Sequence, residues 1–130
     1  MENPLENSIK QKNVLSLAYL GDSVFTLFVR NYLVSTFDTK PNTLNKRANM
    51  VVCARAQAKF MEKIKDNLTA EELDIVNRTR NAHLNSRAKN STLAEYSLAT
   101  QFEALIGYWF MLKEYDKIDE IFKKYVVEDL

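Results

Sequence analysis

The chain contains only two glycines and two prolines among its 130 residues. Because tight turns rely on these residues, their scarcity favours a helical protein. No apolar run is long enough to span a bilayer, since the most apolar stretch, residues 14–30, is interrupted by Gly21 and Asp22. The polar, acidic beginning of the chain is unlike a signal peptide. A single cysteine, Cys53, excludes an internal disulfide, and we expect a buried thiol in a reducing cytoplasm.

The length predicts one domain spanning residues 1–130, and 46% hydrophobic with 27% charged residues is typical of globular proteins. The net charge is only +1, but its distribution is uneven. No acid occurs in residues 39–61 or in residues 75–94. This segregation predicts a basic surface suited to phosphates, with a solvated surface that binds no partner as the alternative. The basic residues of the two windows are Lys40, Lys46, Arg47, Arg55 and Lys59, then Arg78, Arg80, Arg87 and Lys89.

Asp22 is the only carboxylate in the apolar stretch, and it directly follows one of the two glycines. At helical spacing it lies at the edge of a polar arc, beside apolar neighbours. An isolated carboxylate is costly to desolvate unless a metal ion, a basic side chain or a helix N-terminus pairs with it. The alternative is an acid at the boundary of the core that touches solvent.

The second glycine, Gly107, lies in another apolar helical run, one turn after Glu103. A glycine inside a helix costs about 1 kcal/mol relative to alanine, and close approach of another backbone is its usual structural reason. Both glycines therefore stand beside acids in helices that form the core. We predict that the two helices cross closely at Gly21 and Gly107, which brings Asp22 and Glu103 together.

The periodicity and capping signals predict an all-α fold, because no segment alternates like a strand for any length. A first helix is expected to begin near Ile9 and to end by residue 37. A second begins at Pro41 and keeps an apolar face as far as Phe60. Capping boxes at residues 69–72 and 92–95 predict two more helices, and an amphipathic segment after residue 115 predicts the last.

Residues 78–92 are the least regular part of the chain, rich in Arg, Lys, Asn and Ser. We predict the end of one helix followed by an exposed loop, and loops on a rigid scaffold concentrate binding residues. Arginine forks and asparagine amides suit phosphate and sugar contacts. His83, the only histidine, has no companions at metal-ligand spacing, so a zinc site is not expected.

Four segments together resemble the ribonuclease III catalytic domain: LAYLGDSVFTLFVR, KPNTLNKRAN, RTRNA and TQFEALIGYWF. The closer similarity is to Mini-ribonuclease III, the bacterial form without a double-stranded-RNA-binding domain. The resemblance covers roughly residues 14–112. It implies an all-helical homodimer that hydrolyses double-stranded RNA with Mg²⁺, or with Mn²⁺ as a substitute ion. The implied biological substrate is the precursor of the large-subunit (23S) ribosomal RNA.

Asp22 matches the aspartate of the family's Gly-Asp signature, and Glu103 matches its later glutamate. The resemblance therefore implies that these two residues hold the metal ion and carry catalysis. The acids that full-length ribonuclease III has nearby are replaced here by Leu15, Ala18 and Thr100, a departure that the Mini form shares. The expected RNA-binding residues are Lys40, Lys46, Arg47, Arg78, Arg80, Asn81, Arg87 and Lys89.

Two other interpretations stay open at this point. The same basic surfaces would serve a helical RNA-binding module, such as a ribosome-assembly factor that no longer cleaves; it would bind without metal and ignore Asp22→Asn. A plain helical interaction protein would bind another polypeptide through the aromatic side chains between Trp109 and Tyr115, but it leaves the acid–glycine placements and the acid-free windows unexplained. The number of metal ions, the cleavage site and the help of a ribosomal protein do not follow from the sequence.

Overall fold

The computed structural model describes residues 4–82 and 92–130. The described part of the chain is helical and contains no strand, so the predicted all-α class is confirmed. Across residues 4–82 and 92–130, seven α-helices are followed or linked by short 3₁₀ and π turns. In chain order the elements are α1 Pro4–Lys10, α2 Val14–Thr36, α3 Pro41–Ala48, α4 Ala54–Ile64, η1 Lys65–Asn67, α5 Ala70–Asn81, α6 Leu93–Met111, α7 Tyr115–Ile121, η2 Phe122–Val126 and η3 Val127–Asp129.

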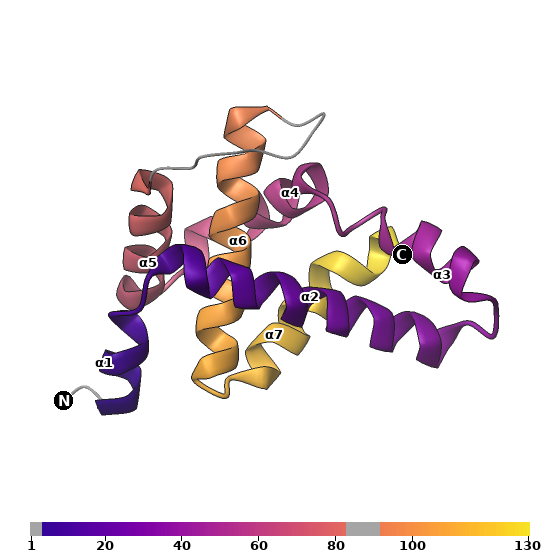
Figure 1. Ribbon diagram of the computed structural model, residues 1–130, viewed down its shortest axis with the longest axis horizontal. Coiled ribbons are helices and arrows are strands. Elements are labelled where there is room, and N and C mark those ends of the chain that lie inside the picture. The colour runs from indigo at the N-terminus through magenta and orange to yellow at the C-terminus, as the bar shows by residue number, and fades with distance from the viewer. Residues whose placement is uncertain (1–3, 83–91) are drawn as a thin grey trace.

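Helix α6 is the centre of the fold, and α2 lies across it (Figure 1). Helices α4 and α5 also pack on α6, so its side chains are buried on almost every face. Phe102 of α6 meets Phe25 of α2 edge-on, with ring centroids 5.4 Å apart, and Phe60 of α4 at 5.7 Å. The first contact is edge-to-face and the second is tilted, and aromatic contacts of this kind add to the free energy gained by burying the rings. They fix how α2 and α4 sit on α6.

Both predicted capping boxes are confirmed. The side-chain oxygens of Thr69 and Thr92 accept from the backbone N–H groups three residues later, and Glu72 and Glu95 return the contact. The expected first helix was wrong, because the chain forms two helices with a break at residues 11–13. Asn13 explains the break: its side chain accepts from the Leu15 N–H at 2.8 Å and so caps the start of α2.

The expected second helix was also wrong, since it divides into α3 and α4. Pro41 begins α3 as predicted. The apolar period continued across the division because Val51, in the intervening turn, is itself fully buried. Cys53 stands in extended backbone as the residue that precedes α4, and it is exposed rather than a buried core thiol. Proximity in sequence to Val51 and Val52 therefore misled the burial prediction.

Helix α6 ends where Lys113 adopts a left-handed backbone conformation, with φ of 62°, and the chain turns there into α7 and the short turns that follow. The predicted amphipathic end of the chain is confirmed, since Ile118, Phe122 and Val126 are buried. Within residues 4–82 and 92–130, no helix combines the length and the apolar character needed to cross a membrane.

Candidate active site

The two glycines meet where α2 crosses α6. A Cβ atom placed on Gly21 would lie 1.7 Å from the backbone oxygen of Glu103, and one placed on Gly107 would lie 2.0 Å from the backbone oxygen of Leu17. Neither position has space for any side chain. The close crossing predicted from the two glycines is therefore confirmed, and its reason is direct contact between backbones.

The crossing brings the carboxyl groups of Asp22 and Glu103 into hydrogen-bonding contact. Asp22 is exposed, whereas Glu103 is half-buried beside the helix crossing. Burial, followed by the hydrogen bond and the charge of Asp22, raises the pKa of Glu103 to about 8. Two carboxylates in contact do not both ionise without a nearby cation. At neutral pH, the metal-free pair therefore retains a proton.

A divalent ion bound by oxygen ligands fits this pair. A cation would favour the charged form of both groups, which the pair by itself disfavours. Among the described residues, no third acid, histidine or cysteine lies close enough to Asp22 and Glu103 to complete a group of three metal ligands. Thr100, where full-length ribonuclease III has an acid, donates its hydroxyl to the Tyr96 carbonyl at 2.8 Å. Two carboxylates suit Mg²⁺, which keeps several of its waters and needs few protein ligands.

The basic residues predicted to bind RNA lie in different settings. Lys40 precedes α3 and Lys46 lies near its end, and both are exposed. Arg47 stacks on the Phe37 ring, 4.1 Å from its centroid, and donates to the Leu130 carbonyl at 3.2 Å. Its guanidinium is thus held in place by contacts within the chain.

Arg78 is held more tightly still. Its guanidinium donates to the backbone carbonyls of Lys10 at 2.5 Å and Lys12 at 3.0 Å, and it lies 3.6 Å from the Asp74 carboxylate. These contacts fasten the junction of α1 and α2 to α5. The spacing of the sequence gave no sign of them, because the partners lie 66 and 68 residues away.

The remaining predicted residues lie at or beyond the end of α5. Arg80 is exposed and, among the described residues, donates to its neighbour Asn77 at 2.6 Å. Asn81 ends the helix, and it is exposed too. Arg87 and Lys89 lie outside the described residues, and so does His83, which the sequence places in the predicted exposed loop.

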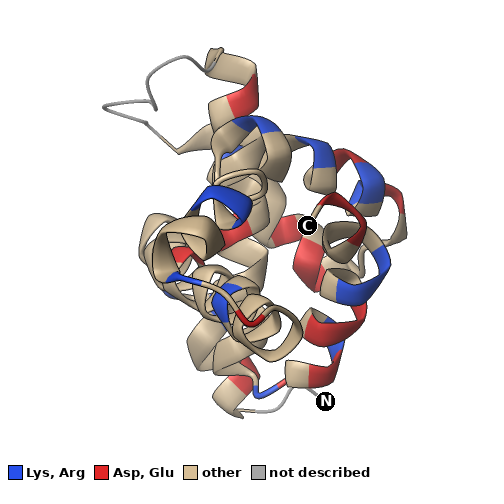
Figure 2. Cartoon of the chain, turned by 90° about the vertical axis from the view of Figure 1, so that its right-hand side faces the viewer, with Lys and Arg blue, Asp and Glu red and all other residues tan. Residues whose placement is uncertain are grey.

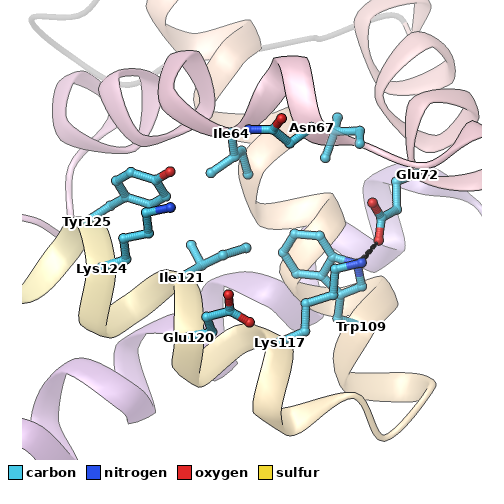
Figure 3. Close-up of a pocket in the computed structure, with 10 residues that line it drawn as sticks. Ile64, Asn67, Glu72, Trp109, Lys117, Glu120, Ile121, Lys124 and Tyr125 are labelled. Carbon is cyan, nitrogen blue, oxygen red and sulfur yellow. Dashed lines mark hydrogen bonds and ion pairs between the residues drawn. The ribbon is translucent and has the colours of Figure 1, made fainter.

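A second buried glutamate, Glu72, was recognised from the sequence only as part of a capping box. Its side chain accepts from the Trp109 ring N–H at 2.8 Å and from the Thr69 backbone N–H at 2.9 Å, and it pairs with Lys117. Figure 3 shows this group at the edge of a cavity of about 170 Å³. Burial acts to raise the pKa of Glu72, but the contacts with Lys117, Thr69 and Trp109 lower it overall. No local sequence signal pointed to this network.

Comparison with known proteins agrees with this geometry. The ribonuclease III domain family matches residues 15–114 of the chain. A Mini-ribonuclease 3 from Staphylococcus aureus is 35% identical over 128 residues, which covers 97% of this chain and 96% of the relative. A Mini-ribonuclease 3 from Clostridium tetani is 40% identical over 119 residues, covering 91% and 79%. One from Brevibacillus brevis is 44% identical over 109 residues, covering 84% and 81%.

A crystal structure of a protein from Fusobacterium nucleatum has the same fold. Its TM-score is 0.84 at 32% sequence identity, with 92% of this chain and 96% of that chain covered. The family match includes both glycines and both acids of the helix crossing. The chain belongs to the ribonuclease III family of endoribonucleases.

Proposed function

We propose that this protein cleaves double-stranded RNA with Mg²⁺, that Asp22 and Glu103 carry the reaction, and that the chain forms one catalytic domain. The observation that carries the proposal is the contact between these two carboxyl groups at the glycine crossing, without a cation of the described chain to neutralise them. A shared proton at neutral pH marks a site that is energetically incomplete until a cation binds. Mn²⁺ is the expected substitute ion.

The residues of the chain have distinct tasks in this scheme. Glu103 is held by the crossing itself, because its backbone oxygen touches Gly21. Asp22 reaches solvent and can meet a phosphate approaching from outside. Asp22 and Glu103 would hold a divalent ion, and when bound it would supply the positive charge that polarises a phosphodiester and activates water. Loss of the shared proton prepares the carboxylates to hold that ion.

Substrate binding is assigned to exposed basic groups. Duplex RNA is recognised mainly through its phosphates and 2′-hydroxyls, and it needs no base-reading surface. Lys40, Lys46 and Arg80 are exposed, and Asn81 adds an amide at the end of α5. Arg87 and Lys89, which lie outside the described residues, complete the proposed set. From the resemblance to Mini-ribonuclease III noted in the sequence, we propose the large-subunit (23S) ribosomal RNA precursor as the substrate, processed in the cytoplasm, with or without a ribosomal protein as helper.

A homodimer is the proposed assembly, with one active site for each RNA strand. An exposed apolar stripe on α2, the helix of Asp22, supports it: Tyr19 is 82% exposed, Leu27 60% and Val34 67%. At helical spacing these three residues lie on one side of α2. Large apolar side chains exposed together in this way are typical of protein interfaces.

The experiment is a cleavage assay on long double-stranded and single-stranded RNA, with Mg²⁺ or with EDTA. Asp22→Asn and Glu103→Gln are compared with Asp38→Asn and Glu120→Gln, which make the same chemical changes at exposed acids. We expect cleavage of the duplex alone, lost with EDTA and in the first two variants. Binding without cleavage under every condition would instead support the inactive RNA-binding module.

A further inference from the structure

The last residues of the chain form ion pairs with α4. The Lys63 ammonium lies 3.0 Å from the Glu128 carboxylate, and the Lys59 ammonium lies 3.1 Å from the Asp129 carboxylate. Lys59 and Lys63 are one turn apart on α4, so they face the same way. Consecutive acids thus meet consecutive lysines of one helix face.

The next residue continues the pattern onto α3. The Leu130 carbonyl oxygen accepts from Arg47, whose guanidinium is already oriented by stacking on Phe37. Three successive residues of the chain therefore place oxygen atoms on three basic side chains from two helices. We call Arg47, Lys59 and Lys63 the basic stripe, and residues 128–130 the acidic tail. Around the C-terminal end of the chain, acidic and basic segments interleave (Figure 2).

These contacts hold the tail only weakly. In each pair one side chain is more than half exposed, Lys59 at 53% and Glu128 at 58%, while its partner is about a third exposed. Ion pairs this open to water contribute little free energy. Val126, just before the tail, is fully buried and anchors the segment. The carboxylates can therefore turn away from the lysines while the chain before them stays in place.

We propose that the basic stripe is a second contact surface for the RNA backbone, and that the acidic tail competes with RNA for it. This inference rests on the proposed function. Carboxylate oxygens stand where phosphate oxygens would accept the same hydrogen bonds from lysine and arginine. Two of the three stripe residues, Arg47 and Lys59, come from the acid-free window of residues 39–61. The tail supplies the acids that this window lacks.

The test measures binding of a short fluorescein-labelled duplex RNA by fluorescence anisotropy, in EDTA to prevent cleavage, over a range of salt concentrations. The variant Glu128→Gln/Asp129→Asn removes the charges of both acidic side chains of the tail and leaves the rest of residues 1–130 unchanged. We expect it to bind about threefold to tenfold more tightly than wild type at low salt. Its dependence on salt should steepen by about one or two in the logarithmic slope, since each phosphate contact contributes about 0.9.

The matched control is Asp119→Asn/Glu120→Gln, which makes the same change in net charge at a half-buried and an exposed acid and also frees a lysine, Lys123, from its pair. We expect the control to change the affinity less than twofold. Adding Lys59→Gln/Lys63→Gln to the tail variant should return the affinity to the wild-type value or below. An equal gain in tail variant and control, or a gain that survives loss of the lysines, would overturn the proposal.

The proposal and the function on which it rests fail separately. If wild type cleaves duplex RNA but the tail variant binds it no better than the control, only the competition is refuted. If the tail variant gains affinity but wild type never cleaves, the nuclease function fails and the RNA surface stands. Absence of RNA binding in every variant refutes both.

Discussion

Two glutamates of this protein, the buried Glu72 and the half-buried Glu103, have pKa values shifted in opposite directions. Glu72 has a cation, an indole N–H and a backbone N–H as partners, and together they lower its pKa. Glu103 has burial and another acid, Asp22, and its pKa rises to about 8. Both acids lie on or beside α6. The difference teaches that one carboxylate has cationic and N–H partners within the fold, whereas the other is paired with an acid, as suits the proposed binding of a cation.

This difference separates structure from function on physical grounds. A buried charge with complete partners stabilises a particular packing, here of α5 against α6 and α7. Two acids in contact, one of them exposed and the other with a raised pKa, destabilise the folded state unless a bound cation neutralises them. The following predictions test the contrast, beginning with the joint that creates the acid pair.

The largest effect is expected for Gly21→Ala or Gly107→Ala. Alanine usually stabilises a helix by about 1 kcal/mol relative to glycine, but here the added methyl overlaps a backbone oxygen. We expect a loss of more than about 3 kcal/mol in the free energy of unfolding, measured by urea denaturation. Ser23→Ala, at an exposed position of α2, is the control and should change it by less than about 0.5 kcal/mol. A fully stable Gly21→Ala protein would refute the crossing.

Glu72→Gln is expected to be the next most damaging change. It leaves Lys117 and the Trp109 N–H beside a neutral amide, so a charge-assisted network is lost from a buried site. We expect about 2–3 kcal/mol of destabilisation at pH 7. Glu71→Gln, on the same turn of α5 and outside the network, is the comparison. Equal stability of the two variants would contradict the assignment.

In the metal-free protein, Glu103→Gln should change the free energy of unfolding in the opposite direction from Glu72→Gln. Because the pKa of Glu103 is higher in the folded state than its ordinary value of 4.5, the folded protein binds the proton more tightly. The contribution of this group to the free energy of unfolding is therefore fully present below about pH 4.5, and it is lost as the pH rises toward 8. Thermal unfolding in EDTA should show the melting temperature of wild type falling from pH 5.5 to 8.5, and that of Glu103→Gln changing less.

Mg²⁺ sharpens that test. Added at pH 8, the ion should raise the melting temperature of wild type, because it binds the folded state. Glu103→Gln should respond much less, since one of the two ligands has lost its charge. A full response in the variant would mean that the ion binds elsewhere.

The smallest effect is expected for Arg78→Lys. Lysine keeps the charge but cannot donate to two carbonyls in the fixed geometry of a guanidinium. We expect a loss of about 1 kcal/mol, seen as faster hydrogen exchange in α1. Arg80→Lys, two residues later and exposed, should leave exchange unchanged. If Arg80→Lys instead weakens RNA binding more than Arg78→Lys does, the two arginines differ in role as their contacts indicate.

The features that the sequence predicted well were those that depend on neighbouring residues. Capping boxes need partners three residues apart, and a glycine in an apolar helix has few explanations other than close contact. Both glycines pointed to the crossing because each required a partner, and each was the only partner available to the other. The acid pair followed from their positions next to the glycines.

The features missed were those settled by distant partners or by competition between local signals. Glu72 meets Trp109 and Lys117 across 37 and 45 residues, and no spacing rule connects them. Asn13 began a new helix at a point where apolar periodicity alone predicted continuity. Arg78 looked like a free cation because the carbonyls that it binds carry no signal in the sequence. Charge patterns thus identified basic side chains but not their availability.

The glycine crossing has a consequence for genetics and engineering. Backbone from α2 touches backbone from α6 beside both acids, so the proposed active centre cannot be moved without moving the helix crossing on which the fold is built. Random mutation at Gly21 or Gly107 should yield temperature-sensitive alleles, never stable enzymes with altered metal preference. Variants with a new metal preference will have to come from side chains around the crossing, while Gly21 and Gly107 remain glycine.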